Sequence, residues 1–189
     1  MIWKGKRWRG FELRGFVVWL TGLPASGKTT IARRLEEKLR ELGWDTEVLD
    51  GDELRKGLSE DLGFSKEDRL KHGRRVAYLA KMLAKHGVAV VVSLVSPYRA
   101  MRDHARSLIE KFIEVYVKCS VETCMKRDPK GLYKRAVRGE IKNFTGISDP
   151  YEEPESPEVV VDTEKMNPEQ CVQKILEKLT ELKYVTCSV

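Results

Sequence analysis

Short apolar runs alternate along the chain with longer stretches in which apolar residues recur every three or four positions. The runs at 16–20 and 88–95 are almost purely apolar, which is typical of strands buried on both faces of a sheet. Further strands are predicted at 46–49, 112–117 and 159–161. Strands that alternate with helices predict an α/β fold with a central parallel sheet and helices on both faces.

Helical spacing marks the segments between these strands. Ile31, Leu35 and Leu39 fit one face of a helix over 28–42, which Gly43 ends. A second helix carries its apolar side from Val76 to Ala84. Other helices are predicted at 100–110, 121–127 and 172–182.

Residues 128–158 break this rhythm with proline, glycine and many charges. Too little chain follows this stretch to form a second domain. We therefore predict a basic arm over 1–15 and one domain over 16–189, with a mobile lid at approximately 128–150.

Composition narrows the function classes. The 189 residues suffice for one domain, and 41% hydrophobic with 34% charged residues exclude a low-complexity or wholly disordered chain. The longest purely apolar runs have five residues, against the roughly 20 that a membrane-spanning helix needs. No apolar signal segment follows the first basic residues, so we predict a cytoplasmic protein without a membrane partner.

Charge does not require a nucleic-acid partner. Of the net charge of +6, the first fifteen residues contribute +4, so the rest of the chain is nearly balanced. The basic arm, with Trp3 and Trp8, is open to three interpretations: a nucleic-acid contact, a cover for a neighbouring subunit, or partial disorder. The four cysteines lack CxxC spacing and histidines at ligand spacing, which favours free thiols over a metal cluster.

The segment Gly22-Leu23-Pro24-Ala25-Ser26-Gly27-Lys28-Thr29 fits the pattern G-x-x-x-x-G-K-[ST]. It follows a predicted strand and opens a predicted helix, which is the context that a phosphate-binding loop requires. Backbone N–H groups and the helix N-terminus surround a phosphate there, Lys28 reaches the β- and γ-phosphates, and Thr29 is a Mg²⁺ ligand. The sequence predicts that the chain binds a nucleoside triphosphate.

A phosphate loop usually has a carboxylate at a neighbouring strand end. The strand over 88–95 ends in Ser96-Pro97-Tyr98, whereas Asp50-Gly51-Asp52 closes the strand over 46–49. A parallel sheet places this acidic pair on the side of the phosphate loop, and the alternative is that Asp52 only caps a helix. The absence of an N-K-x-D motif argues against a GTPase.

Several further blocks are more specific than the phosphate loop. They are LDGDELRKGLSEDLGFSKEDR (49–69), VSPYRAMR (95–102), RDPKGLYKRA (127–136) and IKNFTGISDPYEEP (141–154). Together with LTGLPASGKTT (20–30) they resemble, in order, the adenylyl-sulfate kinase (APS kinase) family of P-loop kinases. This resemblance implies a three-layer P-loop NTPase fold and Mg²⁺-dependent transfer of the ATP γ-phosphate to the 3′-hydroxyl of adenosine 5′-phosphosulfate in sulfate assimilation. It also implies a homodimer and a functional link to ATP sulfurylase.

The resemblance assigns roles to individual residues. It makes Asp52 the base or orienter for the 3′-hydroxyl, with Asp50 supporting the Mg²⁺ environment. Arg55 and Arg69 hold the phosphosulfate, for which a planar fork of donors is well suited. The ATP-binding set comprises Gly22, Leu23, Pro24, Ala25, Ser26, Gly27, Lys28, Thr29, Thr30 and Arg127.

The acceptor nucleotide is expected between two rings. By resemblance, Phe64 and Phe144 sandwich its adenine, an arrangement that contributes on the order of 1–3 kcal/mol per base. The alternative interpretation makes both of them core residues. Lys142 helps to neutralise the phosphates, and the basic segment 130–138 forms the lid over ATP.

Two positions carry special expectations. His72 stands where the family usually has asparagine in D-R-x-x-N, and a neutral histidine can also donate and accept hydrogen bonds. Ser96 stands at the serine that is assigned in some family members as a phosphoserine intermediate, and we include it, with Lys28 and Asp52, among the catalytic residues.

Two other function classes stay open. Another small-molecule P-loop kinase, of the gluconate or nucleotide kinase type, would have little use for the pair Phe64 and Phe144. A nucleotide-binding sensor without turnover would not need both Lys28 and Asp52.

Overall fold

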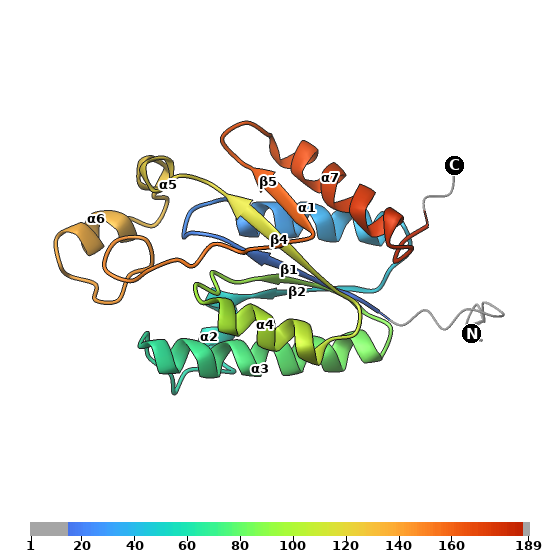
Figure 1. Cartoon of the computed structure of the whole chain (residues 1–189), viewed down its shortest axis with the longest axis horizontal. Coiled ribbons are helices and arrows are strands. Elements are labelled where there is room, and N and C mark those ends of the chain that lie inside the picture. The colour runs from blue at the N-terminus through green and yellow to red at the C-terminus, as the bar shows by residue number, and fades with distance from the viewer. Residues whose placement is uncertain (1–14, 187–189) are drawn as a thin grey trace, which may run out of the picture.

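A computed structural model describes residues 15–186 and contains one five-stranded sheet (Figure 1). All strand pairs are parallel, and the strand order is β2-β3-β1-β4-β5. The strands are β1 Val17–Thr21, β2 Thr46–Asp50, β3 Ala89–Ser93, β4 Phe112–Lys118 and β5 Val159–Asp162. The predicted parallel α/β fold is confirmed. Strand β3 is shorter than the strand predicted over 88–95, because the chain leaves the sheet after Ser93.

Seven helices occur within the described residues. They are α1 Lys28–Glu41, α2 Gly51–Lys56, α3 Lys66–Lys85, α4 Arg99–Leu108, α5 Val121–Arg127, α6 Leu132–Val137 and α7 Pro168–Glu181. The short helices α2 and α6 were not predicted, since six residues give too few turns for an apolar period. Helix α3 begins well before its apolar stretch because Ser65 caps it and accepts a hydrogen bond from the Asp68 N–H.

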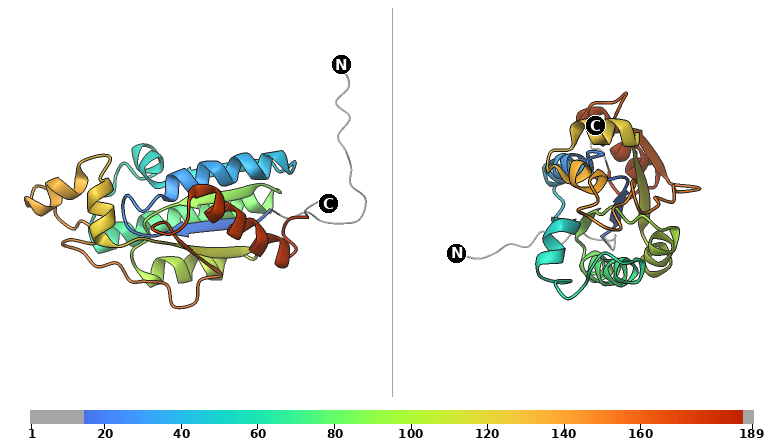
Figure 2. Two further views of the ribbon diagram at one scale, coloured as in Figure 1. Left: turned by 90° about the horizontal axis from the view of Figure 1, so that it is seen from above. Right: turned by 90° about the vertical axis from the view of Figure 1, so that its left-hand side faces the viewer.

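The sheet lies between two helical layers (Figures 1 and 2). Alternate residues of β1 point to opposite faces: Val18 and Leu20 pack with α1 and α7, while Val17 and Trp19 pack with α3 and α4. The two central strands β1 and β3 are buried at every position, which explains why their sequences are almost purely apolar. This arrangement is the three-layer architecture that the sequence predicted.

The carboxyl edge of the sheet carries a third, smaller apolar cluster (left in Figure 1). There α5, α6 and their loops gather around Leu23, Tyr133 and Phe144. This cluster fixes most of the predicted lid to the phosphate loop. The mobility of 128–150 stays a prediction, and residues 1–14 of the predicted arm lie outside the described residues.

Two smaller expectations concern cysteines and the membrane. Cys119, Cys124 and Cys171 are buried free thiols, as predicted, whereas Cys187 lies outside the described residues. Over 15–186 the longest helices are too short or too polar for a membrane span.

Candidate active site

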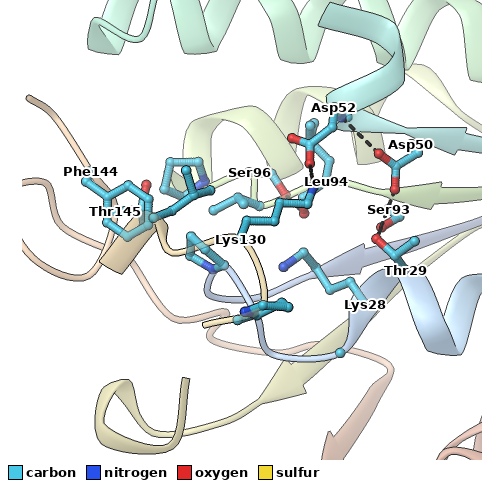
Figure 3. A pocket seen from close by; sticks show the side chains of 18 of the residues that line it. Lys28, Thr29, Asp50, Asp52, Ser93, Leu94, Ser96, Lys130, Phe144 and Thr145 are labelled. Atoms are coloured by element: carbon cyan, nitrogen blue, oxygen red, sulfur yellow. Dashed lines mark hydrogen bonds and ion pairs between the residues drawn. The ribbon is translucent and has the colours of Figure 1, made fainter. Parts of the chain in front are cut away.

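One cavity of about 920 Å³ opens at the carboxyl edge of the sheet, between the phosphate loop, α2, α3 and the lid (Figure 3). Most of the predicted site residues line it. They are Pro24, Ala25, Gly27, Lys28, Thr29, Thr30, Asp50, Asp52, Arg55, Phe64, Arg69, His72, Ser96, Arg127, Lys142 and Phe144. Segments from across the whole chain therefore converge on one space.

Gly22, Leu23 and Ser26 are predicted ATP-binding residues that do not line this cavity. Gly22 has φ +154°, and a Cβ placed there would lie 2.5 Å from the Val117 carbonyl oxygen, so the motif needs glycine for close packing. Ser26 is fully buried, and its carbonyl accepts a hydrogen bond from Thr163 Oγ1 at 3.0 Å. These three residues support the loop from behind.

Lys28 is the first residue of α1 and is buried among the backbone of its own loop. Its Nζ donates to the carbonyl oxygens of Gly22 at 3.0 Å and Leu23 at 2.7 Å. Burial lowers the pKa of Lys28 to about 8, although Cys124, Asp52 and Asp50 act in the opposite direction. The lysine is therefore a poorly solvated cation that gains from an added anion.

Oxygen atoms of Thr29, Asp50 and Ser93 meet beside the loop (Figure 3). Thr29 Oγ1 donates to Asp50 Oδ2 at 2.9 Å and lies 3.3 Å from Ser93 Oγ. Sequence reasoning missed Ser93, because the apolar run continues to Val95 and hides where the strand ends. Hydroxyl and carboxylate oxygens are ligands that Mg²⁺ accepts, so this group fits a shared metal site that phosphate oxygens complete.

The two acidic residues Asp50 and Asp52 have different structural roles. Asp50, not Asp52, is the N-cap of α2, and its Oδ1 accepts a hydrogen bond from the Asp52 N–H at 2.9 Å. The alternative that Asp52 only caps a helix is therefore wrong. The Asp52 side chain is largely exposed and forms an ion pair with Lys130 of the lid at 2.5 Å.

Two guanidinium groups lie near the ring of Phe64. The Arg55 guanidinium carbon lies 4.4 Å from the ring centroid, and that of Arg69 lies 5.5 Å away. Burial lowers the pKa of Arg55, and the neighbouring Arg69 charge adds to this effect. Arg69 forms an ion pair with Asp149 at 3.9 Å, whereas Arg55 forms no salt bridge with any residue between 15 and 186. This end of the cavity therefore carries positive charge that an anion would neutralise.

His72 lies at the same end, and its side chain is almost completely buried. Its Nδ1 is 2.9 Å from Ser59 Oγ, while Nε2 has no hydrogen-bond partner within the described structure. Burial, together with the charges of Arg55, Arg75 and Arg69, lowers the pKa of His72 to about 4. The ring is thus neutral at pH 7 and has one nitrogen available to a ligand.

Phe144 and Phe64 differ sharply in their surroundings. Phe144 is 8% exposed and packs edge-on against Tyr133 with centroids 4.9 Å apart, whereas Phe64 is 55% exposed. Phe144 is therefore partly a core residue, as the alternative interpretation expects, but its ring also lines the cavity. Sequence reasoning missed its neighbour Thr145, whose buried Oγ1 finds no hydrogen-bond partner among the described residues. The signal available for Thr145 was the matched block around FTG.

Ser96 lines the cavity but its hydroxyl is already engaged. Ser96 Oγ accepts a hydrogen bond from Trp19 Nε1 at 3.0 Å and donates to the Leu94 carbonyl at 3.3 Å. A hydroxyl held in this way is poorly placed to act as a nucleophile.

Two predicted basic residues lie at the rim. Arg127 donates to Thr163 through both terminal nitrogens, at 3.0 Å to the hydroxyl and 2.7 Å to the carbonyl. This fixes the plane of the guanidinium against the loop that follows β5. Lys142 is exposed and precedes Phe144 on the lid.

Comparisons with known proteins identify the family of the chain. Residues 14–162 match the family model described as Adenylylsulphate kinase. A probable adenylyl-sulfate kinase of Pyrococcus abyssi is 51% identical over 92% of this chain and 99% of its own length. A probable bifunctional SAT/APS kinase of Sorangium cellulosum is 54% identical over 92% of this chain, which spans only 30% of that protein.

A solved structure extends the likeness to three dimensions. The APS kinase CysC of Mycobacterium tuberculosis, in complex with AMPPNP and APS, superimposes with a TM-score of 0.86 at 41% identity. The match covers 88% of this chain and 98% of that chain. The chain therefore belongs to the adenylyl-sulfate kinase family.

Proposed function

We propose that the chain transfers the γ-phosphate of ATP to the 3′-hydroxyl of adenylyl sulfate, which yields PAPS and ADP. One observation supports this most strongly. A single cavity has a phosphate loop at one end and an aromatic ring flanked by two guanidinium groups at the other. The Mycobacterium tuberculosis relative was solved with AMPPNP and APS together, which is the pair of ligands that such a cavity would hold.

The donor half binds the ATP phosphates. Backbone N–H groups of the loop and the N-terminus of α1 surround them, and Lys28 exchanges its carbonyl partners for phosphate oxygens. Thr29 and Asp50 would hold Mg²⁺, which supplies neutralisation of charge on the phosphates when it is bound. Arg127 packs against the ATP nucleoside at the rim.

The acceptor half binds adenylyl sulfate. Its adenine stacks between Phe64 and Phe144, and Arg55 with Arg69 neutralises the phosphosulfate. The free Nε2 of His72 forms a hydrogen bond with the bound nucleotide, in the role that asparagine has in the family pattern. Lys142 adds positive charge from the lid.

Transfer needs alignment more than covalent help from the protein. Asp52 accepts the proton of the 3′-hydroxyl as the hydroxyl oxygen forms its bond to the γ-phosphorus. The bond to the β–γ bridging oxygen breaks, and ADP leaves with that electron pair. Lys130, which is paired with Asp52 in this structure, moves to the phosphates as the lid closes.

The test is release of ADP from ATP and Mg²⁺, with and without adenylyl sulfate. We expect strong stimulation with PAPS as product, and loss of it in Asp52→Ala. Glu53→Ala is the matched control, because Glu53 is the next carboxylate of α2, pairs among residues 15–186 with Arg33 and lies outside the cavity lining. Absence of stimulation in the wild type would overturn the proposal. Tight ATP or PAPS binding without turnover would then favour a sensor.

The remaining partners are also proposals. We propose a homodimer and a functional link to ATP sulfurylase. The Sorangium relative is named as bifunctional, and a relative from Thiobacillus denitrificans is named as a hexameric APS kinase. Sedimentation of the full chain at several concentrations decides the oligomeric state.

A further inference from the structure

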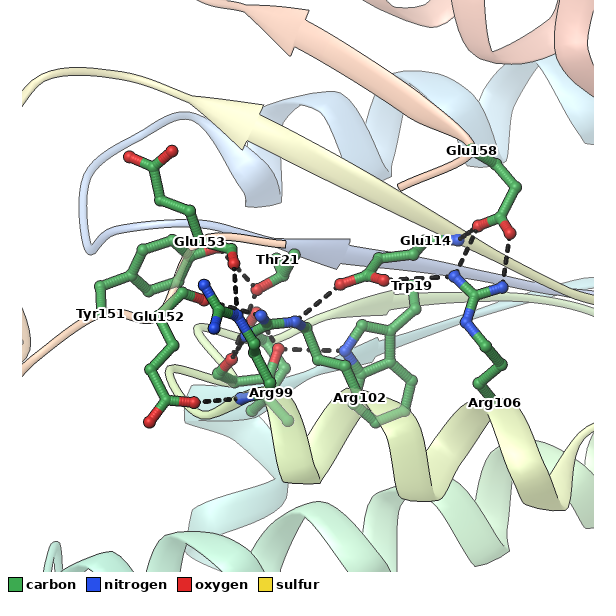
Figure 4. A network of polar contacts seen from close by, with 12 residues as sticks. Trp19, Thr21, Arg99, Arg102, Arg106, Glu114, Tyr151, Glu152, Glu153 and Glu158 are labelled. Carbon is green, nitrogen blue, oxygen red and sulfur yellow. Dashed lines mark hydrogen bonds and ion pairs between the residues drawn. The ribbon is translucent and has the colours of Figure 1, made fainter. Parts of the chain in front are cut away.

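A buried network of charged side chains lies behind the cavity, outside the residues with proposed roles (Figure 4). At its centre, Arg102 of α4 and Glu114 of β4 form an ion pair with Nε and Oε1 2.6 Å apart. Arg102 is only 2% exposed and does not line the cavity. A buried arginine is costly unless all its donors are satisfied, so its contacts indicate what it does.

The loop in front of Arg102 has a backbone conformation that its sequence disfavours. Ser96 has φ +39°, in the left-handed region that residues other than glycine rarely adopt. The following Pro97 disfavours this conformation further, because a residue before proline is restricted to extended backbone. Tertiary contacts must therefore hold Ser96 in place.

Arg102 supplies one of the strongest of these contacts. Its Nη1 donates to the Ser96 carbonyl at 2.7 Å. Trp19 Nε1 holds the Ser96 hydroxyl at 3.0 Å, and Thr21 Oγ1 donates to the Val95 carbonyl at 2.9 Å. The loop is thus held from the interior, while its other side faces the cavity.

The same guanidinium also reaches the segment that follows the lid. Arg102 Nη2 donates to the Glu152 carbonyl at 2.6 Å, and the Glu152 N–H donates to the Pro97 carbonyl at 2.8 Å. The segment that includes Glu152 begins a few residues after Phe144 and Thr145. Arg102 therefore joins the loop that lines the cavity at Ser96 to the segment that directly follows the cavity residues Phe144 and Thr145.

The three nitrogens of this one planar group contact three different segments, through one ion pair and two hydrogen bonds to carbonyl oxygens. Nε faces Glu114, Nη1 faces Ser96 and Nη2 faces Glu152. A lysine ammonium cannot span this geometry. Arg106 approaches Glu114 from the next turn of α4 and also pairs with Glu158, so that two positive and two negative charges balance.

We propose that Arg102 is a positioning residue for phosphoryl transfer. It holds Ser96 in the left-handed conformation and fixes the β3–α4 loop against the segment after Phe144, so that the acceptor hydroxyl is aligned with the γ-phosphate. The expected effect of Arg102 on catalysis rests on the proposed function. Its effect on the position of Ser96 can be measured without turnover.

The decisive comparison is Arg102→Lys with Arg106→Lys. Both changes keep the charge and affect the same partner, Glu114, but Arg106 touches neither Ser96 nor Glu152. We expect R102K to lower kcat about 100-fold, the typical cost of a misplacement near 1 Å, with the KM for ATP nearly unchanged. We expect R106K to keep kcat within about twofold, because Arg106 is partly exposed and makes no contact with the loop at Ser96.

A second readout follows the Trp19 indole N–H by NMR, with the resonance assigned from Trp19→Phe. In R102K this resonance should shift, because Ser96 Oγ moves away from its donor, whereas R106K should leave it in place. Equal kcat in the two variants, equal losses in both, or an unmoved Trp19 resonance in R102K would overturn the proposal.

Folding is the remaining risk, since one buried charge would lose its partner. If R102K does not fold, the comparison becomes Glu114→Gln against the double variant R102M/E114Q, which leaves no unpaired carboxylate at this position. The double variant alone should lose kcat, and a loss already complete in E114Q would overturn the proposal. A wild-type protein without ADP release in response to adenylyl sulfate would defeat the proposed function, while the Trp19 resonance would still test the hold on Ser96.

Discussion

The two halves of the cavity are built by different means. The donor half consists of strand ends and the turns that directly follow them, so that Thr29, Asp50 and Ser93 meet within hydrogen-bond distance. The acceptor half takes Phe64 from the loop before α3 and Phe144 from the lid, 80 residues apart in the chain. The sheet itself therefore preorganises one half, and loop packing assembles the other.

The same difference separates the two acceptor rings. Phe144 is part of an apolar cluster with Tyr133 and Leu23, while Phe64 is exposed to solvent and lies near two guanidinium groups. Phe144 is thus fixed by apolar packing without a ligand. Phe64 is held instead by cation–π contacts with the nearby guanidinium groups.

Replacement of each ring by alanine is the strongest test of this contrast. Phe144→Ala removes a buried ring and should lower the free energy of unfolding by about 3–5 kcal/mol. Phe64→Ala should leave stability nearly unchanged, but it should weaken acceptor binding by about 1–3 kcal/mol because a stacking surface is lost. Urea denaturation and the KM for adenylyl sulfate give the two numbers. Equal stability losses would show that both rings are core residues.

Lys28→Met tests the donor half. The variant should lose on the order of 10²–10³-fold in kcat, because a positive group at the developing charge disappears. Its stability should not fall, since a lysine whose pKa is lowered to about 8 by burial opposes folding in its charged form at neutral pH. Leu35→Ala, in the core below α1, is the matched control that should lose stability. A large drop in the melting temperature of Lys28→Met would mean that the loop depends on the lysine for its own structure.

The donor half was largely predictable from the sequence because its chemistry is local. The phosphate loop has fixed spacing, and Asp50 and Asp52 follow their strand directly. The sequence did not show the structural role of the individual residues at these strand ends. An apolar run that continues to Val95 conceals the strand end at Ser93, and only the backbone shows that Asp50 rather than Asp52 caps α2.

The acceptor half and its supports were predictable only through resemblance. No local pattern states that Phe144 would be buried against Tyr133, or that Thr145 would keep an unpaired hydroxyl. Arg102 ends the matched block VSPYRAMR, but no local pattern predicts its burial, since a charged residue on a helix usually faces water. Its burial depends on Glu114 and on a carbonyl 50 residues away in the chain.

His72 supplies a pH test of the acceptor half. Its pKa is about 4 in the folded chain and near 6.5 when unfolded, so the unfolded chain binds the extra proton between these values. Stability should therefore be complete above about pH 6.5 and fall by about 3 kcal/mol as the pH drops to about 4. His72→Asn should flatten this part of the curve, and the same change at exposed His86 should not. Identical curves for wild type and His72→Asn would place the titration elsewhere.

The smallest expected effect concerns Lys28 in the donor half. Burial lowers its pKa as it lowers that of His72, but Lys28 is expected to act in its charged form and His72 in its neutral form. Lys28 titrates near pH 8 in the free protein, whereas His72 stays neutral throughout the neutral range. A bound phosphate favours the charged lysine, so ATP binding above about pH 8 must be accompanied by proton uptake. ATP affinity should then fall by up to about tenfold per pH unit between about pH 8 and pH 10. Calorimetry in buffers of different ionisation enthalpy measures both the affinity and the proton. Lys28→Arg, which does not titrate in this range, should bind more weakly but with a flat profile, and a slope that persists in it would assign the proton to another group.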